Sequence, residues 1–172
     1  MARPKRIYYE NAVYHITGRC NNKQPLLNSN ESKIDFLNTV SKYKKRFGFK
    51  LYCFAIMDNH IHLIIETNRL FNISKVMQAI MLSFSLKLRR KNEYTGHVWQ
   101  GRFRSKLIRD EGYILECIEY IHNNPVRAGF VEKAKDYLWS SYGFYNTGVN
   151  AELINRIEVD RFGDTSVTTN WE

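Results

Sequence analysis

Two histidines separated by one isoleucine, His60 and His62, are the residues whose types and spacing most directly suggest chemistry. They flank Ile61 at the start of an apolar run that ends at Ile65, a composition typical of a β-strand. Because side chains alternate between faces along a strand, both imidazoles would project from the same side of a sheet. Imidazole nitrogens are good ligands for divalent metals, so the pair would supply half of a metal site.

A second pair, Tyr120 and Asn124, lies four residues apart on a predicted helix, so both side chains would share one helix face. A phenol oxygen can attack phosphorus and form a phosphotyrosine when a cation offsets the developing charge. The amide oxygen of Asn124 is an acceptable third ligand for Mg²⁺ or Mn²⁺. Because Pro125 disfavours the α conformation at the residue before it, a helix-capping role for Asn124 fits the spacing equally well. The two pairs together predict metal-assisted chemistry on a phosphodiester.

Two other classes of enzyme that use closely spaced histidines are excluded by the residues present. The histidine-triad nucleotide hydrolases need a third histidine at position 64, where this chain has Ile64. Phosphodiesterases with paired His-x-Thr or His-x-Ser motifs need a second copy of the motif, which the sequence lacks.

The charge of the chain is divided unevenly along the sequence. Residues 1–110 carry 21 Lys and Arg against 7 Asp and Glu, a net +14, whereas residues 111–172 carry 5 against 10, a net −5. Such segregation favours a polyanionic partner, and we expect nucleic acid. No apolar run approaches the roughly 18 residues of a membrane span. Three scattered cysteines without the paired spacing of a zinc site predict a reducing, cytoplasmic setting.

Hydrophobic spacing predicts the elements that would position these residues. The predicted strands are 13–20, 49–57, 60–67 and 98–108, and the predicted helices are 31–47, 73–91 and 113–123, the last ended by Pro125. This order predicts an α+β, ferredoxin-like fold, an antiparallel sheet with helices on one face and a further C-terminal helix that carries Tyr120. We expect one domain over residues 1–148 and a polar, loosely attached tail over 149–172.

The predicted helix 73–91 has an unusually broad apolar surface. Met81, Leu82 and Leu86 widen its stripe, so the helix would be buried on two sides or would contact a second copy of the chain. The sequence leaves a monomer and a homodimer both open.

Basic residues predict the surface that would bind DNA. Arg102, Arg104 and Lys106 alternate along predicted strand 98–108, so they would share a face and follow a phosphate backbone. The further candidates for DNA contact are Arg3, Lys5, Arg6, His15, Arg89, Arg90, Lys91 and Arg127. Several of these residues have an alternative role within the protein. His15 could form an internal hydrogen bond, and Arg127 could bind a carbonyl at a helix end. The cations that end helix 73–91 could interact with the helix dipole.

Five stretches together resemble the HUH (His–hydrophobic–His) single-tyrosine transposases, and among them the REP-associated branch. The stretches are YHITGRCNN (14–22), MDNHIHLIIE (57–66), VWQGRFRSK (98–106), EYIHNNPVRAGFVE (119–132) and LWSSY (138–142). The resemblance implies metal-dependent cleavage and rejoining of single-stranded, hairpin-containing DNA through a 5′-phosphotyrosine intermediate and a free 3′ hydroxyl. It matches His60 and His62 to the metal-binding pair, Tyr120 to the nucleophile, and Asn124 to the polar residue that completes the metal site.

The chain departs from this family before the histidines, where Leu-Pro-x-His is common and Ile56-Met57-Asp58-Asn59 is present here. The sequence also leaves two other functions open. A non-catalytic, ferredoxin-like module that binds nucleic acid would explain the charge without a metal. A sequence-specific RNA-binding protein would expose aromatic side chains on the sheet, whereas histidines and arginines are expected there.

Overall fold

A four-stranded antiparallel sheet forms the centre of the fold, with strand order β2-β3-β1-β4. The strands are β1 (Val13–Arg19), β2 (Lys50–Ile56), β3 (His60–Glu66) and β4 (Arg104–Ile108). The structure is a computed structural model that describes residues 8–148 and 152–157. The predicted α+β fold with an antiparallel sheet is confirmed, and the described elements follow the predicted order of strands and helices.

Three long helices connect or follow the strands, and each begins at a side chain that caps it. They are α1 (Asn30–Phe47), α2 (Ile73–Asn92) and α3 (Glu111–Arg127). The capping side chains of Ser29, Asn72 and Asp110 each accept a hydrogen bond from the backbone N–H three residues later. Two 3₁₀ turns, η1 (Asn21–Lys23) and η2 (Ala134–Asp136), and the short helix α4 (Tyr142–Thr147) complete the described elements.

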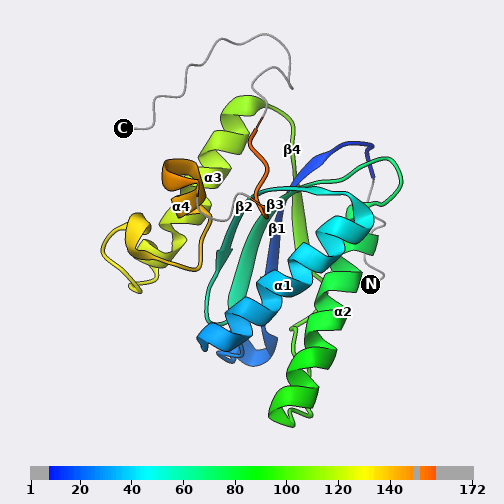
Figure 1. The fold of residues 1–172 in the computed structure, drawn as a ribbon, viewed down its shortest axis with the longest axis vertical. Coiled ribbons are helices and arrows are strands. Elements are labelled where there is room, and N and C mark those ends of the chain that lie inside the picture. The colour runs from blue at the N-terminus through cyan, green and yellow to red at the C-terminus, as the bar shows by residue number, and fades with distance from the viewer. Residues whose placement is uncertain (1–7, 149–151, 158–172) are drawn as a thin grey trace.

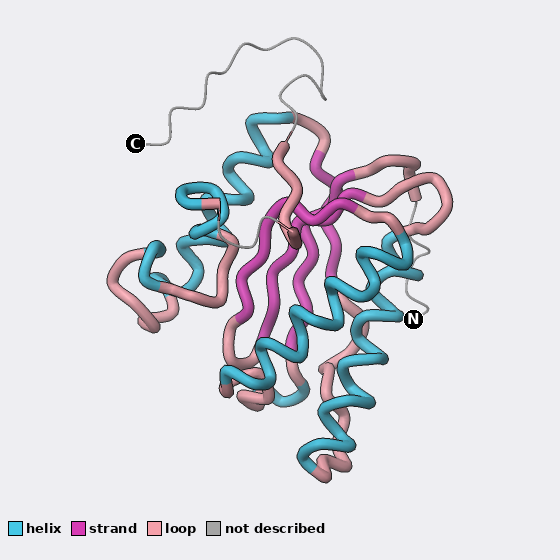
Figure 2. Tube along the Cα trace, viewed as in Figure 1, coloured by secondary structure: helices cyan, strands magenta, loops and turns pink. Residues whose placement is uncertain are grey.

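Both faces of the sheet are covered, by different helices (Figures 1 and 2). Ile61 and Leu63 of β3 point into the larger core, which α1 and α2 cover. Ile64 points to the opposite face and packs with Ile118 and Ile121 of α3. The prediction of helices on one face is therefore correct for α1 and α2, whereas α3 covers the other face. By the alternation of β3, this second face carries His60 and His62.

The strand predicted over 98–108 is wrong in its first half, because β4 begins only at Arg104. Upstream, the chain follows the end of β1 irregularly: Gln100 N donates to the carbonyl of Arg19, and Trp99 forms an isolated bridge with Cys20. The Trp99 ring packs against Phe36 and Phe84 at the edge of the larger core. Arg102 therefore lies on a loop beside β1 and not on the strand.

The predicted end of the tyrosine-bearing helix at Pro125 is also wrong, because α3 continues through this proline to Arg127. Pro125 lacks an N–H, but its carbonyl still accepts from Phe130 N at 2.9 Å, and Gly129 N donates to Val126 O at 3.0 Å. These two bonds form a Schellman motif with Gly129 in the left-handed conformation, φ +75°. Asn124 thus stays within the helix.

We predict that Gly129→Ala lowers the free energy of unfolding by about 1–2 kcal/mol. An added Cβ at Gly129 would meet no atom within 4 Å, so the cost comes from the left-handed backbone alone. Gly101→Ala is the matched control, because that site is equally open and has no positive φ. Urea unfolding at constant m value measures both variants. Equal stability of the two would contradict the assigned helix end.

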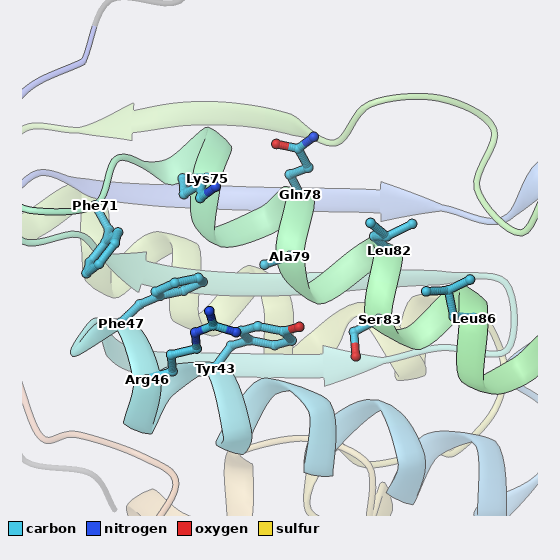
Figure 3. Close-up of a pocket in the computed structure, with 10 residues that line it drawn as sticks. All are labelled: Tyr43, Arg46, Phe47, Phe71, Lys75, Gln78, Ala79, Leu82, Ser83 and Leu86. Carbon is cyan, nitrogen blue, oxygen red and sulfur yellow. The ribbon is translucent and has the colours of Figure 1, made fainter.

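Helix α2 has an uncovered apolar surface toward α1 (Figure 3). Leu82 and Leu86 are 57% and 47% exposed and line a groove of about 510 Å³ with Tyr43, Phe47 and Phe71. Burial of α2 on two sides within the chain, one of the two predictions, is therefore wrong. A contact with a second copy stays a prediction. Among the helices that the structure describes, none has the length and hydrophobicity needed to cross a membrane.

The first described residues of the predicted C-terminal tail pack on β2 and α1. Ile154 is 4% exposed, Asn155 N donates to Leu51 O at 2.7 Å, and Lys44 Nζ donates to the carbonyl of Leu153 at 2.6 Å. The other tail residues, 149–151 and 158–172, lie outside the described residues, and the division of the chain at residue 148 stays a prediction.

Candidate functional site

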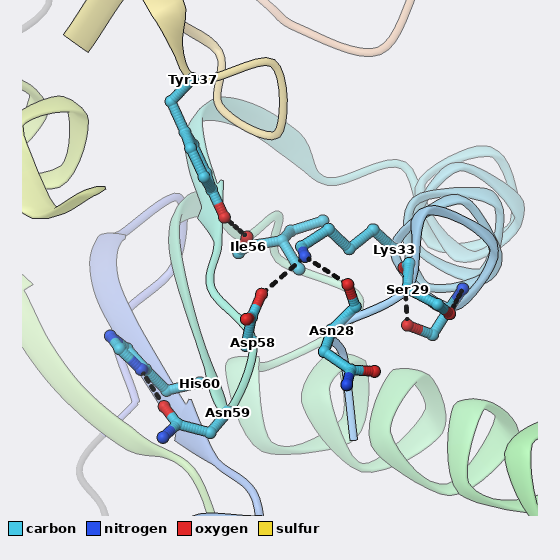
Figure 4. A network of polar contacts seen from close by, with 9 residues as sticks. Asn28, Ser29, Lys33, Ile56, Asp58, Asn59, His60 and Tyr137 are labelled. Carbon is cyan, nitrogen blue, oxygen red and sulfur yellow. Dashed lines mark hydrogen bonds and ion pairs between the residues drawn. The ribbon is translucent and has the colours of Figure 1, made fainter. Parts of the chain in front are cut away.

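The turn before β3 fixes the position of His60 (Figure 4). Lys33, which is 4% exposed, reaches from α1 and pairs with Asp58 Oδ1 at 2.7 Å. The carbonyl of Asn59 accepts from Cys20 N, and its side-chain Oδ1 lies 2.6 Å from His60 Nδ1. Because this carboxamide oxygen only accepts hydrogen bonds, the proton of His60 resides on Nδ1. The Nε2 lone pair of His60 is then available to a ligand.

Helix α3 brings Tyr120 and Asn124 over the histidines of β3, and the two side chains share a helix face as their spacing predicted. The Tyr120 ring lies 5.9 Å from the His62 ring and 6.1 Å from the His15 ring, centroid to centroid. Asn124 Nδ2 lies 3.1 Å from His62 Nε2. The helix face that carries this pair therefore points at the metal-ligand candidates. The capping alternative for Asn124 assumed that the helix ends before Pro125, and α3 continues past this residue.

His15 contacts the histidine pair from the neighbouring strand. Its Nε2 lies 3.1 Å from His62 Nδ1, and its ring centroid lies 5.4 Å from that of His62. If His62 Nδ1 donates to His15, the lone pair of His62 Nε2 faces the Asn124 amide. Of the two predicted roles, the structure supports the hydrogen-bonded one, in which His15 orients His62.

All three histidines have lowered pKa values, and burial is the main cause for each. Burial and then the charges of His15, His60 and Arg19 lower the pKa of His62 to about 3. The pKa of His60 is lowered by burial and by the Arg19 guanidinium, and that of His15 by burial and by Lys106. Neutral imidazoles at physiological pH are the form that binds metals.

The donors around the pair suit a mixed ligand set. Within residues 8–148 and 152–157, no group of three or more His, Cys, Asp or Glu residues is placed to hold a metal. A third protein ligand beside His60 and His62 would therefore be of another type, and Asn124 is the amide in contact with His62. Side-chain O and N of an amide are assigned from their contacts, so rotation of Asn124 would present its oxygen instead.

A buried histidine on the opposite side of α3 attaches this helix to the rest of the fold. His122 Nε2 lies 2.9 Å from Ser141 Oγ and 3.4 Å from Cys53 Sγ. Ser141 Oγ in turn accepts from the backbone N–H of Phe54 in β2. Burial lowers the pKa of His122 to about 4. The neutral ring therefore connects α3, β2 and the segment before α4.

We predict that His122 makes the fold sensitive to acid. Between pH 6.5 and about 4 the unfolded chain binds a proton at this residue that the folded chain excludes. The free energy of unfolding should therefore fall as the pH falls through this window, by up to about 1.4 kcal/mol per pH unit from this group. His122→Gln should reduce that slope, whereas His97→Gln, at an exposed position, should keep it. Identical slopes for all three proteins in urea unfolding would contradict this role.

Some of the predicted DNA-binding residues lie on the side of the sheet that α3 covers. Arg104 and Lys106 are exposed on β4 and pair in register with Thr17 and His15 of β1. The Arg127 guanidinium lies 5.1 Å from the centroid of the Tyr120 ring. These three of the predicted DNA-binding cations therefore lie on the same side of the sheet as Tyr120, and their role in DNA binding stays a prediction.

Other predicted DNA-binding residues are not brought to this face. Lys91 forms ion pairs with Glu31 and Asp35 of α1, and an Arg89 nitrogen donates to the carbonyl of Gly96. Arg90 is exposed at the end of α2, in the helical layer on the opposite side of the sheet. A role for these residues in DNA binding stays a prediction. Arg3, Lys5 and Arg6 lie outside the described residues.

Arg19 is a site residue that the sequence analysis missed. It pairs in register with His60, and its charge contributes to the lowered pKa values of both metal-ligand candidates. The signal was present, because His15, Thr17 and Arg19 alternate along one predicted strand and must share a face. What was lacking was the pairing of β1 with β3, which places that face beside the histidines.

Comparisons with known proteins identify the family of the chain. Residues 8–124 match the family model described as "Transposase IS200 like". A Haemophilus influenzae protein, provisionally named a REP-associated tyrosine transposase, is 29% identical over 133 residues, which are 69% of this chain and 74% of that protein. The REP-associated tyrosine transposase of Escherichia coli is 22% identical over 143 residues, 83% of each chain.

A solved structure shares the fold. It is described as a REP-associated tyrosine transposase bound to a REP hairpin, and it superposes with a TM-score of 0.70 at 18% identity. The match covers 98% of this chain and 100% of the other.

Proposed function

Because this chain belongs to the IS200-like transposase family, we propose that it cleaves and rejoins single-stranded, hairpin-containing DNA through a 5′-phosphotyrosine formed on Tyr120. His60, His62 and Asn124 would hold the Mg²⁺ or Mn²⁺ that this chemistry needs. The observation that carries the proposal is the convergence of Tyr120 and Asn124 of α3 on the histidine pair of β3. Because the chain belongs to a transposase family, we expect it to cleave DNA and transfer DNA strands.

The donor set supports a divalent cation at this site. The Nδ1 proton of His60 is directed to Asn59, and a His62 Nδ1 proton donated to His15 would leave both Nε2 lone pairs for a metal. Two imidazoles and one carboxamide oxygen are ligands that Mg²⁺ and Mn²⁺ accept, with the remaining positions open to water and phosphate oxygens. When bound, the cation would withdraw charge from the scissile phosphate.

Tyr120 provides the nucleophile in this proposal. Its side chain is 42% exposed, so a DNA strand can reach the phenol and its proton can leave to water. The phenol oxygen forms a bond to the scissile phosphorus, and the bond from phosphorus to the 3′ oxygen of the preceding nucleotide breaks. That 3′ oxygen takes a proton from water, so the nucleotide departs with a free 3′ hydroxyl. A 3′ hydroxyl attacking the phosphotyrosine reverses the step and joins strands.

Arg127 supports the same step. Its guanidinium over the Tyr120 ring is close enough to pair with a phosphate oxygen of the bound strand, and arginine suits such pairing by its planar fork of donors. Because the histidines are neutral, the positive charge near this site would come from the metal cation, the arginines and Lys106.

The test is a search for the covalent intermediate. The protein is incubated with Mn²⁺ and labelled single-stranded stem-loops taken from the DNA that flanks its own gene, and the products are separated on a denaturing gel. We expect a labelled band at the mass of protein plus DNA, absent when EDTA replaces Mn²⁺. Binding of the stem-loops without any adduct would contradict the proposal and favour the non-catalytic DNA-binding module.

A further inference from the structure

A second pocket opens on the same face of the sheet, next to the histidine pair. It has a volume of about 330 Å³ and is lined by Thr17, Arg19, Gln100, Gly101, Arg102 and Arg104. Thr17 pairs in register with His62, and Arg19 with His60. Neighbouring strands lie about 5 Å apart, so the pocket begins one strand away from the proposed metal ligands.

The lining of this pocket is cationic. Arg19, Arg102 and Arg104 are exposed, and among the contacts of the described residues none of the three forms an ion pair with a carboxylate. No acidic side chain lines the pocket. Three uncompensated guanidiniums around one hollow favour a phosphate group, which arginine binds through paired hydrogen bonds.

The loop that carries Gln100 and Arg102 is held along the end of β1. Gln100 N donates to the carbonyl of Arg19 at 2.9 Å, and Asn21 N donates to Val98 O at 2.9 Å. An added Cβ at Gly101 would meet nothing within 4 Å, so this side of the pocket is open to a ligand. The Gln100 amide and the Thr17 hydroxyl add neutral hydrogen-bonding groups suited to a sugar or a base.

The position of Tyr120 sets the direction of a bound strand. The Tyr120 ring lies next to His15 and His62, whereas the pocket extends along β1 from Thr17, which pairs with His62, to Arg19, which pairs with His60. In an in-line displacement at phosphorus, the attacking and leaving oxygens lie on opposite sides. The leaving 3′ oxygen therefore points toward the Arg19 end of the site.

We infer that this pocket binds the nucleotide on the 5′ side of the scissile phosphate, the one that departs with the 3′ hydroxyl, and that Arg102 pairs with its 5′ phosphate; the inference rests on the proposed function. Held there after cleavage, the 3′ hydroxyl stays next to the phosphotyrosine. The pocket thus retains the strand end that rejoining requires.

The test places one neutral methylphosphonate in a stem-loop that wild type cleaves, either at the phosphate immediately 5′ of the scissile one or at the phosphate immediately 3′ of it. For wild type we expect the 5′ substitution to slow adduct formation about tenfold, and the 3′ substitution to have a much smaller effect. Arg102→Gln should slow the all-phosphate substrate by a similar factor, with no further loss on the 5′-substituted one. The control Arg46→Gln, in the groove of Figure 3, should behave like wild type.

Each other outcome overturns the assignment. Multiplicative losses from Arg102→Gln and the 5′ substitution would show that the two groups do not meet. If the 5′ substitution left the rate of adduct formation by wild type unchanged, no phosphate would bind in the pocket. If the 3′ substitution slowed adduct formation more than the 5′ substitution, the strand would run in the opposite direction. Failure of wild type to form an adduct with any unmodified stem-loop contradicts the proposed function itself, and with it this assignment.

Discussion

Tyr120→Phe is expected to abolish the covalent protein–DNA adduct, with a loss of at least about a thousandfold in cleavage, while stem-loop binding stays within about twofold of wild type. The substitution removes one oxygen and leaves the ring beneath the Arg127 guanidinium. Among the described contacts the Tyr120 hydroxyl makes no hydrogen bond, and the side chain is 42% exposed, so the free energy of unfolding should barely change. The loss therefore isolates the nucleophile.

The matched control is Tyr113→Phe on the same helix. Tyr113 lies seven residues earlier on α3, with its ring 4.5 Å from Lys106 Nζ, and it should keep adduct formation near the wild-type rate. Denaturing gels give the adduct, and gel-shift titration gives the binding. An adduct of normal yield from Tyr120→Phe would remove Tyr120 from its assigned role, and peptide mapping of that adduct would identify the true nucleophile.

His62→Ala is expected to lower cleavage on the order of a thousandfold and to weaken Mn²⁺ binding below detection at millimolar metal. His62 is the central residue of the site, since it contacts His15 through Nδ1 and Asn124 through Nε2. Calorimetric titration of the DNA-free protein with Mn²⁺ measures the metal separately from the chemistry.

His15→Gln is the comparison that separates a ligand from the residue that orients it. Loss of an orienting partner of a metal-bound histidine weakens metal binding by about 10–100-fold, so Mn²⁺ binding should remain measurable. Urea unfolding of both variants checks that neither has lost the fold. Equal Mn²⁺ affinity of wild type and His62→Ala would contradict the metal site.

The local part of the site could be predicted from sequence because it depends only on spacing. The two-residue period of a strand aligned His60 with His62, and the four-residue spacing of a helix aligned Tyr120 with Asn124. The same two periods also predicted the order of the strands and helices along the chain. Whether α3 lies on the face of the histidines depends on contacts between distant segments, such as Ile64 with Ile118, which spacing does not encode.

The errors share a physical cause, which is that tertiary contacts override local preferences. Pro125 lies in the last turn of α3, two residues before its end, where the helix loses one hydrogen bond. The Schellman motif at Gly129, four residues after Pro125, still ends the helix. The residues before Arg104 have strand-like alternation, but Trp99 and Phe103 pack in the α1–α2 core, and the loop follows β1 without regular strand pairing. Arg19 was missed because it lies beside His60 only through the pairing of β1 with β3, which the sequence does not show.

Strand β4 is at an edge of the sheet, with only β1 beside it. An edge strand exposes unpaired backbone groups that invite another chain to add to the sheet, and charged side chains are a common defence against such aggregation. Arg104 and Lys106 are exposed on this five-residue strand, so they would protect this edge from aggregation as well as contact the DNA of the proposed function. Neutralising both at once should make the free protein self-associate at high concentration. In the wild-type protein, DNA bound at saturation would cover the β4 edge and protect it further from association with another chain.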